Sequence, residues 1–249
     1  YDDGRPHVQD ATVISQPPNG IPSNTMLTGP VQLGDIGKAL SGHELGHFRL
    51  DEFVGGGGMG AVFRATDTQL ERTVAVKVLT NRYGKQQDTV RRFRVEAQSA
   101  ARLNHENIAR VYFVGEDKGW NFIVFEFIEG ENIRDIVTRN GPLDVSASLS
   151  CTAQVAEALQ HAADRAVVHR DIKPSNVLMA QTEDRALPKV IDFGIAKAID
   201  PDQSIEITSV LHKRAIGTPA YMSPEQAKGG KVDPRSDVYA IGVVMYQML

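Results

Sequence analysis

Hydrophobic and polar residues alternate with the two-residue period of β-strands along much of the first half of the chain. Three runs show this period and are separated by glycine or polar turns: HFRLDEFV at 47–54, AVFRATD at 61–67 and RTVAVKVL at 72–79. A further run, NFIVFEFI at 121–128, is rich in strand-forming residues and ends before Gly130. We therefore predict a small antiparallel sheet.

Helical spacing replaces this alternation in two longer segments. Residues 88–103 place on one face a set of apolar side chains and one glutamate: Phe93, Glu96, Ala97, Ala100 and Leu103. A second helical segment runs from Ser146 to about Arg165, and a polar loop with short strands follows between 167 and 191. The pattern predicts an α+β fold, with a sheet and one helix first and a mainly helical second half.

Residues 1–46 are rich in Pro, Gly, Ser, Asn and Asp and show no sustained apolar period, so we expect a flexible tail. The sequence HELGH at 43–47 has the spacing of a zinc-protease helix motif. Gly42 and Gly46 weaken a helix at this place, and His47 leads directly into the first predicted strand. We interpret the motif as a chance match and keep a zinc peptidase as an alternative.

Composition narrows the function classes. A formal net charge of -4 and a pI of about 6.0 give no overall attraction to nucleic acid, so none is expected as a partner. Cys151 is the only cysteine, which excludes an internal disulfide and fits the cytoplasm. No apolar run reaches membrane-spanning length, and the late run at 240–249 is expected to be a buried helix. The chain starts at Tyr1, not Met, and is expected to be cut from a longer one.

A glycine-rich stretch, VGGGGMGAV at 54–62, lies between two predicted strands. Gly55, Gly57 and Gly60 occupy the glycine positions of a G-x-G-x-x-G-x-V frame. Glycines allow the backbone to approach phosphate groups and to point its N–H groups at them. A strand and not a helix follows, which distinguishes this stretch from a dinucleotide-binding loop. Taken alone, it is equally consistent with a flexible hairpin.

The next predicted strand carries a lysine among apolar residues. Its two-residue period places Ala75 and Lys77 on one face, beneath the glycine-rich stretch. A lysine in apolar surroundings needs an anionic partner. Glu96 on the inward face of the helix at 88–103 is a candidate, although a solvated glutamate at a helix edge is the simpler interpretation of that residue alone.

The segments HRDIKPSNVLM and KVIDFG can pair as a hairpin. If Leu178 faces Val190, then Asn176 faces Asp192 and both polar groups lie at the same end. Carboxylate and amide oxygens at one edge suit Mg²⁺ that is shared with phosphates. Asp171 precedes Asn176 on the same loop, within reach of an incoming hydroxyl group.

In this order, the motifs resemble the eukaryotic-type protein kinase family and, within it, the bacterial serine/threonine kinases. The resemblance runs from about His47 to Leu249 and rests on GGGGMGAV, VAVK, Glu96, HRDIKPSN, DFG, GTPAYMSPE and DVYAIG. It implies a two-lobed fold, with an N-lobe at 47–128 and an incomplete, mainly helical C-lobe at 129–249. It also implies an enzyme that transfers the γ-phosphoryl group of ATP to Ser or Thr hydroxyls of proteins in bacterial signalling.

The resemblance gives each matching residue a role. Lys77, oriented by Glu96, would hold the α- and β-phosphates of ATP beneath the glycines, and Asn176 and Asp192 would bind Mg²⁺.

For the acceptor, Asp171 would accept or orient the proton of the Ser or Thr hydroxyl, and Lys173 would neutralise charge on the transferring group. Thr218 would brace these two residues.

The resemblance further implies an adenine site made of three apolar side chains and two backbone positions: Val62, Ala75 and Leu178, and Glu126 and Ile128. Phe125 would close the rear of this site with a bulky ring. Each of these apolar residues could equally be ordinary core.

The segment from Asp192 to Glu225 contains hydroxyl groups near a cation. We expect Thr208 or Ser209, with Ser204 in the same polar stretch, to be phosphorylated and to order the segment through Arg170. A solvated loop whose hydroxyls do nothing is the alternative.

Family members continue through further helices, one of which carries an arginine that pairs with the equivalent of Glu225. The resemblance therefore implies that the chain stops short of a complete kinase domain, and a membrane tether beyond Leu249 stays open. It also implies protein substrates, and a kinase homodimer as the form that phosphorylates itself in trans. A pseudokinase scaffold and a small-molecule phosphotransferase are the remaining alternatives.

Overall fold

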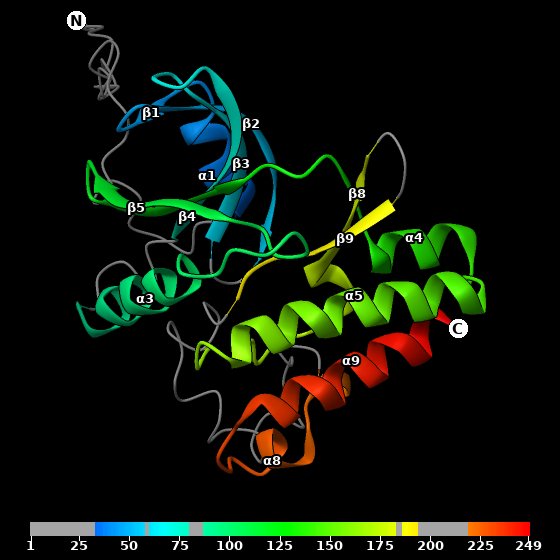
Figure 1. Cartoon of the computed structure of the whole chain (residues 1–249). Coiled ribbons are helices and arrows are strands. Elements are labelled where there is room, and N and C mark those ends of the chain that lie inside the picture. The colour runs from blue at the N-terminus through cyan, green and yellow to red at the C-terminus, as the bar shows by residue number, and fades with distance from the viewer. Residues whose placement is uncertain (1–32, 58–59, 80–86, 183–185, 194–218) are drawn as a thin grey trace, which may run out of the picture.

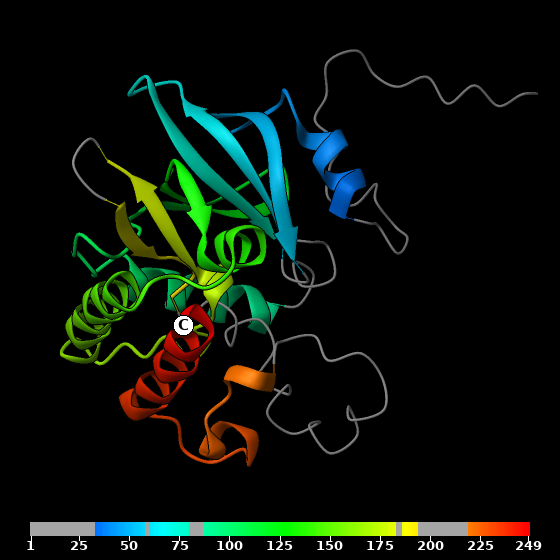
Figure 2. The same ribbon diagram turned by 90° about the vertical axis from the view of Figure 1, so that its right-hand side faces the viewer.

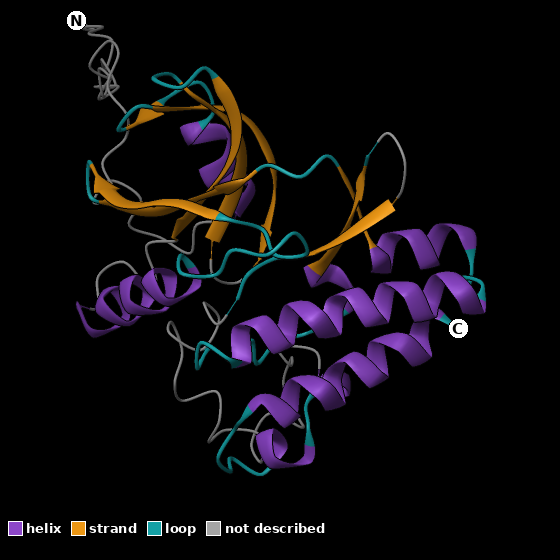
Figure 3. Ribbon diagram, in the orientation of Figure 1, coloured by secondary structure: helices purple, strands orange, loops and turns teal. Residues whose placement is uncertain are grey.

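The structure is a computed structural model in which the described residues are 33–57, 60–79, 87–182, 186–193 and 219–249. A curled antiparallel sheet occupies one end, and a group of helices with a second, small sheet occupies the other (Figures 1 and 3). The two-lobed α+β architecture predicted from the sequence is confirmed.

The large sheet has six strands in the order β1-β2-β3-β4-β6-β5, and all paired neighbours are antiparallel. Its strands are β1 (Glu44–Leu45), β2 (Phe48–Gly57), β3 (Gly60–Asp67), β4 (Arg72–Leu79), β5 (Val111–Asp117) and β6 (Trp120–Glu126). Strand β6 ends earlier than the predicted run at 121–128, because residues 127–129 leave the ladder to connect the two sheets.

The two faces of β4 bury different residues, as its alternating pattern predicts. Val74, Val76 and Val78 are fully buried in a core on one face. Ala75 and Lys77 lie on the other face, which is covered by α3 (Gln87–Ala100). The buried face of α3 carries the apolar residues expected there, namely Phe93, Ala97 and Ala100.

The flexible tail expected for residues 1–46 is wrong for residues 33–46. Residues 33–40 form the helix α1 (Leu33–Leu40), whose Ile36 and Leu40 are buried against the valine face of the sheet. This helix spans only two turns, which is too short for a sustained apolar period, and its burial depends on sheet residues that are distant in the sequence. Residues 1–32 lie outside the described residues.

The second lobe combines a small sheet, in the order β7-β8-β9, with several helices. Its elements are β7 (Gly130–Asn132), α4 (Ile133–Asn140), α5 (Val145–Ala163), η1 (Pro174–Asn176), β8 (Val177–Gln181), β9 (Ala186–Val190), η3 (Pro219–Tyr221), α8 (Pro224–Ala227) and α9 (Pro234–Met248). Helices α5 and α9 lie side by side and share one core (Figure 1).

Side-chain caps fix where the long helices of this lobe begin. Asp144 accepts a hydrogen bond from the N–H of Ala147 at 3.0 Å, and Asp233 accepts one from the N–H of Arg235 at 2.9 Å. Within the described ranges, no helix is both long and apolar enough to cross a membrane. The run at 240–249 lies largely in α9, where Ile241 and Val244 are buried as expected.

Candidate active site

The strand register places the glycine-rich stretch beside Lys77. Gly55 on β2 pairs with Val62 on β3, and Val62 pairs with Lys77 on β4, so the three residues form one row across the sheet. Two strand spacings separate Gly55 from Lys77, a distance of about 10 Å between their backbones. The row therefore brings glycine backbone and an ammonium group to the same region. Residues 58–59 are not described.

Close packing explains the glycine at position 60 before any ligand is considered. A Cβ atom on Gly60 would collide with the carbonyl oxygen of Val78 on the neighbouring strand. At Gly56, an added Cβ would lie 2.5 Å from the carbonyl oxygen of Gly60. The backbone of β3 thus approaches β2 at Gly56 and β4 at Gly60 too closely for side chains at these two positions. Gly55 adopts a φ of 150° that other residues rarely reach.

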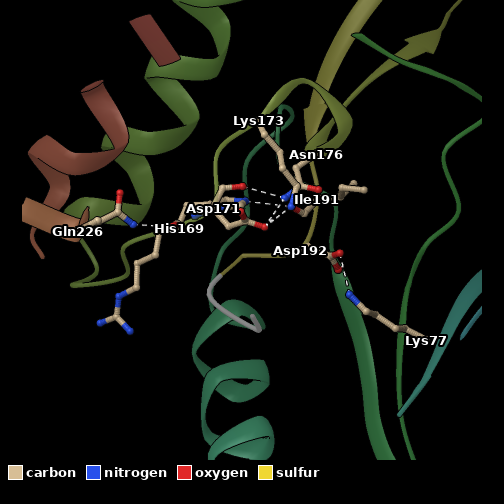
Figure 4. A network of polar contacts seen from close by, with 9 residues as sticks. Lys77, His169, Asp171, Lys173, Asn176, Ile191, Asp192 and Gln226 are labelled. Atoms are coloured by element: carbon tan, nitrogen blue, oxygen red, sulfur yellow. Dashed lines mark hydrogen bonds and ion pairs between the residues drawn. The ribbon is translucent and has the colours of Figure 1, made fainter. Parts of the chain in front are cut away.

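Lys77 finds its anionic partner across the two lobes (Figure 4). Its Nζ lies 2.7 Å from Oδ2 of Asp192, and the lysine side chain is only 9% exposed. Burial opposes ionisation of Asp192, but the Lys77 ammonium, with Lys173 nearby, outweighs burial and holds the pKa of Asp192 below its ordinary value. Asp192 is therefore a carboxylate at neutral pH.

The expected pairing of Lys77 with Glu96 stays a prediction. Glu96 belongs to α3, whose buried residues Phe93 and Ala97 pack against the sheet face that carries Ala75 and Lys77. Its side chain is outside the described part of the structure.

Asp171 lies at the centre of a second polar cluster (Figure 4). Its Oδ2 accepts hydrogen bonds from Nζ of Lys173 at 2.7 Å and from Nδ2 of Asn176 at 3.1 Å. Asn176 also donates Nδ2 to the backbone oxygen of Asp171 at 2.8 Å. The 3₁₀ turn η1, which starts at Pro174, holds Asn176 in this position. The cluster fixes the orientation of one carboxylate with two donors.

The predicted hairpin register is wrong by one residue. Val177 pairs with Val190, so Leu178 faces Lys189 in place of Val190. A slip of one residue exchanges the two faces of a strand, and burial decides between the registers: Val177 and Val190 are both 0% exposed. Asn176 consequently pairs through its backbone oxygen with the N–H of Ile191, at 3.0 Å.

Asp192 was expected opposite Asn176, but Ile191 takes that place and Asp192 follows it in the chain. It adopts a left-handed backbone with a φ of 62°, and its carboxylate contacts Lys77. Both predicted metal ligands are therefore adjacent to Ile191: the backbone oxygen of Asn176 accepts its N–H, and Asp192 is the next residue in the chain.

The donor set of Asn176 and Asp192 fits Mg²⁺. Asp192 offers an ionised carboxylate, and the amide of Asn176 directs Nδ2 at Asp171, which leaves Oδ1 for a cation. Mg²⁺ prefers such oxygen ligands and completes its shell with water and substrate phosphates. Among the described residues, no group of three or more His, Cys, Asp and Glu side chains gathers as a metal cage.

Three residues that sequence reasoning did not assign hold the loop around Asp171 in place: His169, Asp237 and Gln226. Asp237, which is 4% exposed on α9, accepts the N–H of His169 at 2.7 Å and the N–H of Arg170 at 2.8 Å. Gln226 donates its Nε2 to the backbone oxygen of Arg170 at 2.8 Å. Arg170 itself has a φ of 68°, so these bonds hold a strained residue.

His169 and Asp237 lie within the HRDIKPSN and DVYAIG motifs, but nothing in the sequence indicates that they contact each other. Ser223 and Gln226 match the capping-box spacing, which announces a helix start and not a contact with a distant loop. Asp237 lies in the first turn of α9, where an acidic residue is ordinary.

The hydrogen bonds of His169 define its protonation. Nδ1 accepts the N–H of Asp171 at 3.2 Å, so the ring proton is on Nε2, which donates to the backbone oxygen of Ile191 at 2.9 Å. The ring is fully buried and packs on Phe193 with centroids 4.6 Å apart. The neutral His169 ring therefore connects the backbone of Asp171 to that of Ile191, the residue before Asp192.

The residues expected around adenine lie on both sheets. Val62, Ala75 and Leu178 are half-buried, and Phe125 is buried at 9% exposure. The expected backbone positions, Glu126 and Ile128, lie at the end of β6 and in the connection to β7.

The side chain of Glu126 ties the end of β6 to the second lobe. Its Oε1 lies 2.5 Å from Nζ of Lys189 on β9. Its backbone N–H donates to the carbonyl oxygen of Arg110 at 2.9 Å. The adenine assignment itself stays a prediction.

Some predicted residues cannot be placed. Thr218 and the expected phosphorylation sites Ser204, Thr208 and Ser209 fall within 194–218, outside the described residues.

The zinc-motif helix is not formed at 43–47. Leu45 pairs with Phe48 in the short β1–β2 ladder, and the N–H of His43 donates to the backbone oxygen of Leu40. The Nε2 of His47 lies 3.7 Å from Oδ1 of Asp67. The histidines therefore lack the helical frame that the zinc-peptidase alternative requires.

Comparison with known proteins agrees with this geometry. The family profile described as "Protein kinase domain" matches residues 48–249. Serine/threonine-protein kinase PrkC of Bacillus subtilis is 41% identical over 86% of this chain, and serine/threonine-protein kinase PknB of Mycobacterium leprae is 40% identical over 83%. A crystal structure of the PknI kinase domain of Mycobacterium tuberculosis superposes with a TM-score of 0.67 and 28% identity, covering 84% of this chain and 76% of that one.

The match covers only part of the curated relatives. The aligned part spans 31% of the length of PrkC and 33% of that of PknB. The family profile nevertheless covers both lobes and every described residue of the two polar clusters. The chain therefore belongs to the protein kinase domain family.

Proposed function

We propose that this chain is the catalytic part of a bacterial serine/threonine protein kinase, which transfers the γ-phosphoryl group of ATP to Ser or Thr hydroxyls of proteins. One observation carries the proposal. The Asp171 cluster and the Lys77–Asp192 pair are joined through Ile191, which binds both His169 and Asn176 (Figure 4). A proton acceptor, a cation and metal-binding oxygens thus belong to one network.

Lys77 supplies a positive charge for the phosphates of ATP, and Asp192 supplies a negative charge for the Mg²⁺ that accompanies them. Lys77 is a nearly buried cation in the same row as Gly55, so it is placed to bind phosphate oxygens together with the glycine backbone. Asp192 and Asn176 would hold Mg²⁺, which when bound would neutralise negative charge on the phosphates.

Asp171 is the group that handles the proton. As the hydroxyl oxygen forms its bond to the γ-phosphorus, its proton passes to the Asp171 carboxylate; the bond from phosphorus to the bridging oxygen breaks and ADP leaves with the electron pair. Lys173 and Asn176 hold Oδ2 of this carboxylate, which leaves Oδ1 to receive the proton. Lys173 would also offset charge on the transferring group.

Two alternative functions differ from the proposal in the phosphate acceptor: a pseudokinase has none, and a small-molecule phosphotransferase uses a metabolite. A pseudokinase would share the fold, but Lys77, Asp171 and Asp192 are all present, and the first and last are in contact. A small-molecule phosphotransferase would use the same nucleotide site. Transfer to protein and not to metabolite acceptors distinguishes the proposal from both.

The partners and location follow from the family and are part of the proposal. We expect protein substrates and phosphorylation of the chain by a second copy, with the kinase domain in the cytoplasm; a membrane tether in a segment C-terminal to Leu249 stays open. Nucleic acid is not expected as a partner, because the net charge is -4. Phosphorylation at Thr208 or Ser209 would accompany activation.

The test measures transfer of radiolabelled γ-phosphate from ATP to the chain and to a generic protein acceptor. The chain is assayed as given and with its natural continuation past Leu249. Asp171→Asn is expected to lower the rate about 10²- to 10⁴-fold. Asp164→Asn, at an exposed position after α5, is the matched control and is expected to leave the rate unchanged. Undiminished transfer by Asp171→Asn would refute the mechanism.

A further inference from the structure

Helix α1 lies against β2, the strand that contains the first half of the glycine-rich stretch (Figure 2). Ile36 and Leu40 anchor the helix in the core on the valine face of the sheet, and Phe53 of β2 packs against the same core. Between the two anchors, the helix approaches the Phe53 ring so closely that a Cβ on Gly37 would lie 2.6 Å from its Cγ atom. The backbone of α1 therefore rests directly on the ring.

The register of β2 against β3 shifts between Leu50 and Glu52 and again directly after Phe53. Phe53 pairs with Phe63 and Gly55 pairs with Val62, so Val54 is the extra residue of a β-bulge. Such a bulge bends and twists the strand that carries it. The Phe53 ring also contacts the ring of Phe63, with centroids 5.7 Å apart. The direction of β2 at Gly55 thus depends on how firmly Phe53 is held.

We propose that α1 is a positioning element for the nucleotide: by seating Gly37 on Phe53 it fixes the bulge at Val54, positions the backbone of Gly55 and thereby sets its affinity for the phosphates of ATP. The inference rests on the proposed role of Gly55 in ATP binding. The family profile begins at residue 48, so α1 precedes the matched residues and is a feature that the family assignment does not cover.

Gly37→Ala tests the contact because helix propensity and packing act in opposite directions. Alanine favours a helix more than glycine does, so the substitution does not weaken α1 itself. The added methyl group nevertheless collides with the Phe53 ring. We expect the Kd for Mg·ADP, measured by titration calorimetry, and the KM for ATP to rise about tenfold, which corresponds to ~1.4 kcal/mol. The KM for the protein acceptor stays within about twofold of the parent.

Gly242→Ala is the matched control. Gly242 is also a helical glycine, on α9, and an added Cβ there meets no atom within 4 Å. This variant is expected to keep the parent Kd for Mg·ADP. In the Gly37→Ala background, Phe53→Leu removes the colliding ring and is expected to restore the Kd to within about threefold, because a smaller side chain relieves the overpacking.

Backbone amide exchange supplies a readout that does not depend on activity. Gly37→Ala is expected to accelerate exchange in β2 and β3 and to leave β5 and β6 unchanged. If Gly37→Ala does not fold, Ile36→Ala takes its place, since it loosens α1 without adding volume and predicts the same selective loss of nucleotide affinity.

The inference fails if folded Gly37→Ala binds Mg·ADP like the parent, if acceptor and ATP constants change equally, or if Phe53→Leu gives no rescue. Failure of the proposed function has a different signature, because the unaltered chain would then transfer no γ-phosphate to a protein acceptor, whatever its affinity for Mg·ADP.

Discussion

Asp237→Asn is expected to destabilise the chain although it removes no volume. The two carboxylate oxygens of Asp237 accept one backbone N–H each, from His169 at 2.7 Å and from Arg170 at 2.8 Å. An asparagine side chain offers only one oxygen. Whichever way the amide turns, its NH₂ group faces one of these backbone donors, and with Asp237 only 4% exposed little water can replace the lost acceptor.

The magnitude follows from two contributions. A buried N–H left without an acceptor costs ~1–3 kcal/mol. The surviving bond changes from charged to neutral acceptor, which costs roughly a further 1 kcal/mol. We therefore expect the free energy of unfolding to fall by about 2–4 kcal/mol. Part of this loss reaches the active site, because the same bonds hold Arg170 at a φ of 68°.

Urea unfolding measures this loss as a fall in the midpoint concentration at unchanged slope. Asp233→Asn, at the cap of the same helix, is the matched control. Asparagine caps helices as well as aspartate does, and only the exposed ion pair of Asp233 with Arg235 is lost, so a loss much smaller than that of Asp237→Asn is expected. A loss below about 1 kcal/mol for Asp237→Asn would refute the reasoning, since it would mean that the two backbone donors are not dependent on Asp237.

Two further predictions use contacts between elements. Burial, with the nearby charge of Arg165, lowers the pKa of His161, and its neutral Nε2 accepts the N–H of Asn104 at 3.3 Å. The protein is therefore expected to keep this contribution to stability above pH ~6.5 and to lose it as the pH falls further, seen as a drop in Tm that is smaller in His161→Gln; equal drops would contradict the assignment. Lys189→Met, which leaves Glu126 without its partner at 2.5 Å, is expected to cost about 1.5–3 kcal/mol in urea unfolding. Because either substitution removes the ion pair, Glu126→Gln in the Lys189→Met background should cost much less than Glu126→Gln alone, and additive losses would show that the pair does not interact.

The elements whose period is local were predictable from sequence. The alternation in β4 identified both the buried valines and the face of Lys77, because a strand can bury Val74, Val76 and Val78 together in only one way. The spacing along α3 likewise identified the side that packs on the sheet. These features depend on the order of residues within one element and on nothing distant.

The errors arose where two distant segments decide the outcome. The β8–β9 register depends on which residues the second core buries, so an apolar residue at Leu178 and one at Val177 were equally good partners for Val190 until that core was known. The helix at 33–40 was missed because its anchors fit a surface made by strands far along the chain. Asp237 was missed as an acceptor because its bond to His169 spans 68 positions.

The strained positions of the active site are held by contacts from elements outside their own loops. A residue in the left-handed region costs ~1–3 kcal/mol when it is not glycine, and both Arg170 and Asp192 lie there. Arg170 is held by α8 and α9 through Gln226 and Asp237, whereas Asp192 is held from the large sheet by Lys77. Arg170 is thus held by the second lobe and Asp192 by the first, so the distance between these two residues depends on the relative position of the lobes. A change that separates the lobes would release Asp192 first, because Lys77 is its contact across the interface, while the Asp171 loop would keep its supports within the second lobe.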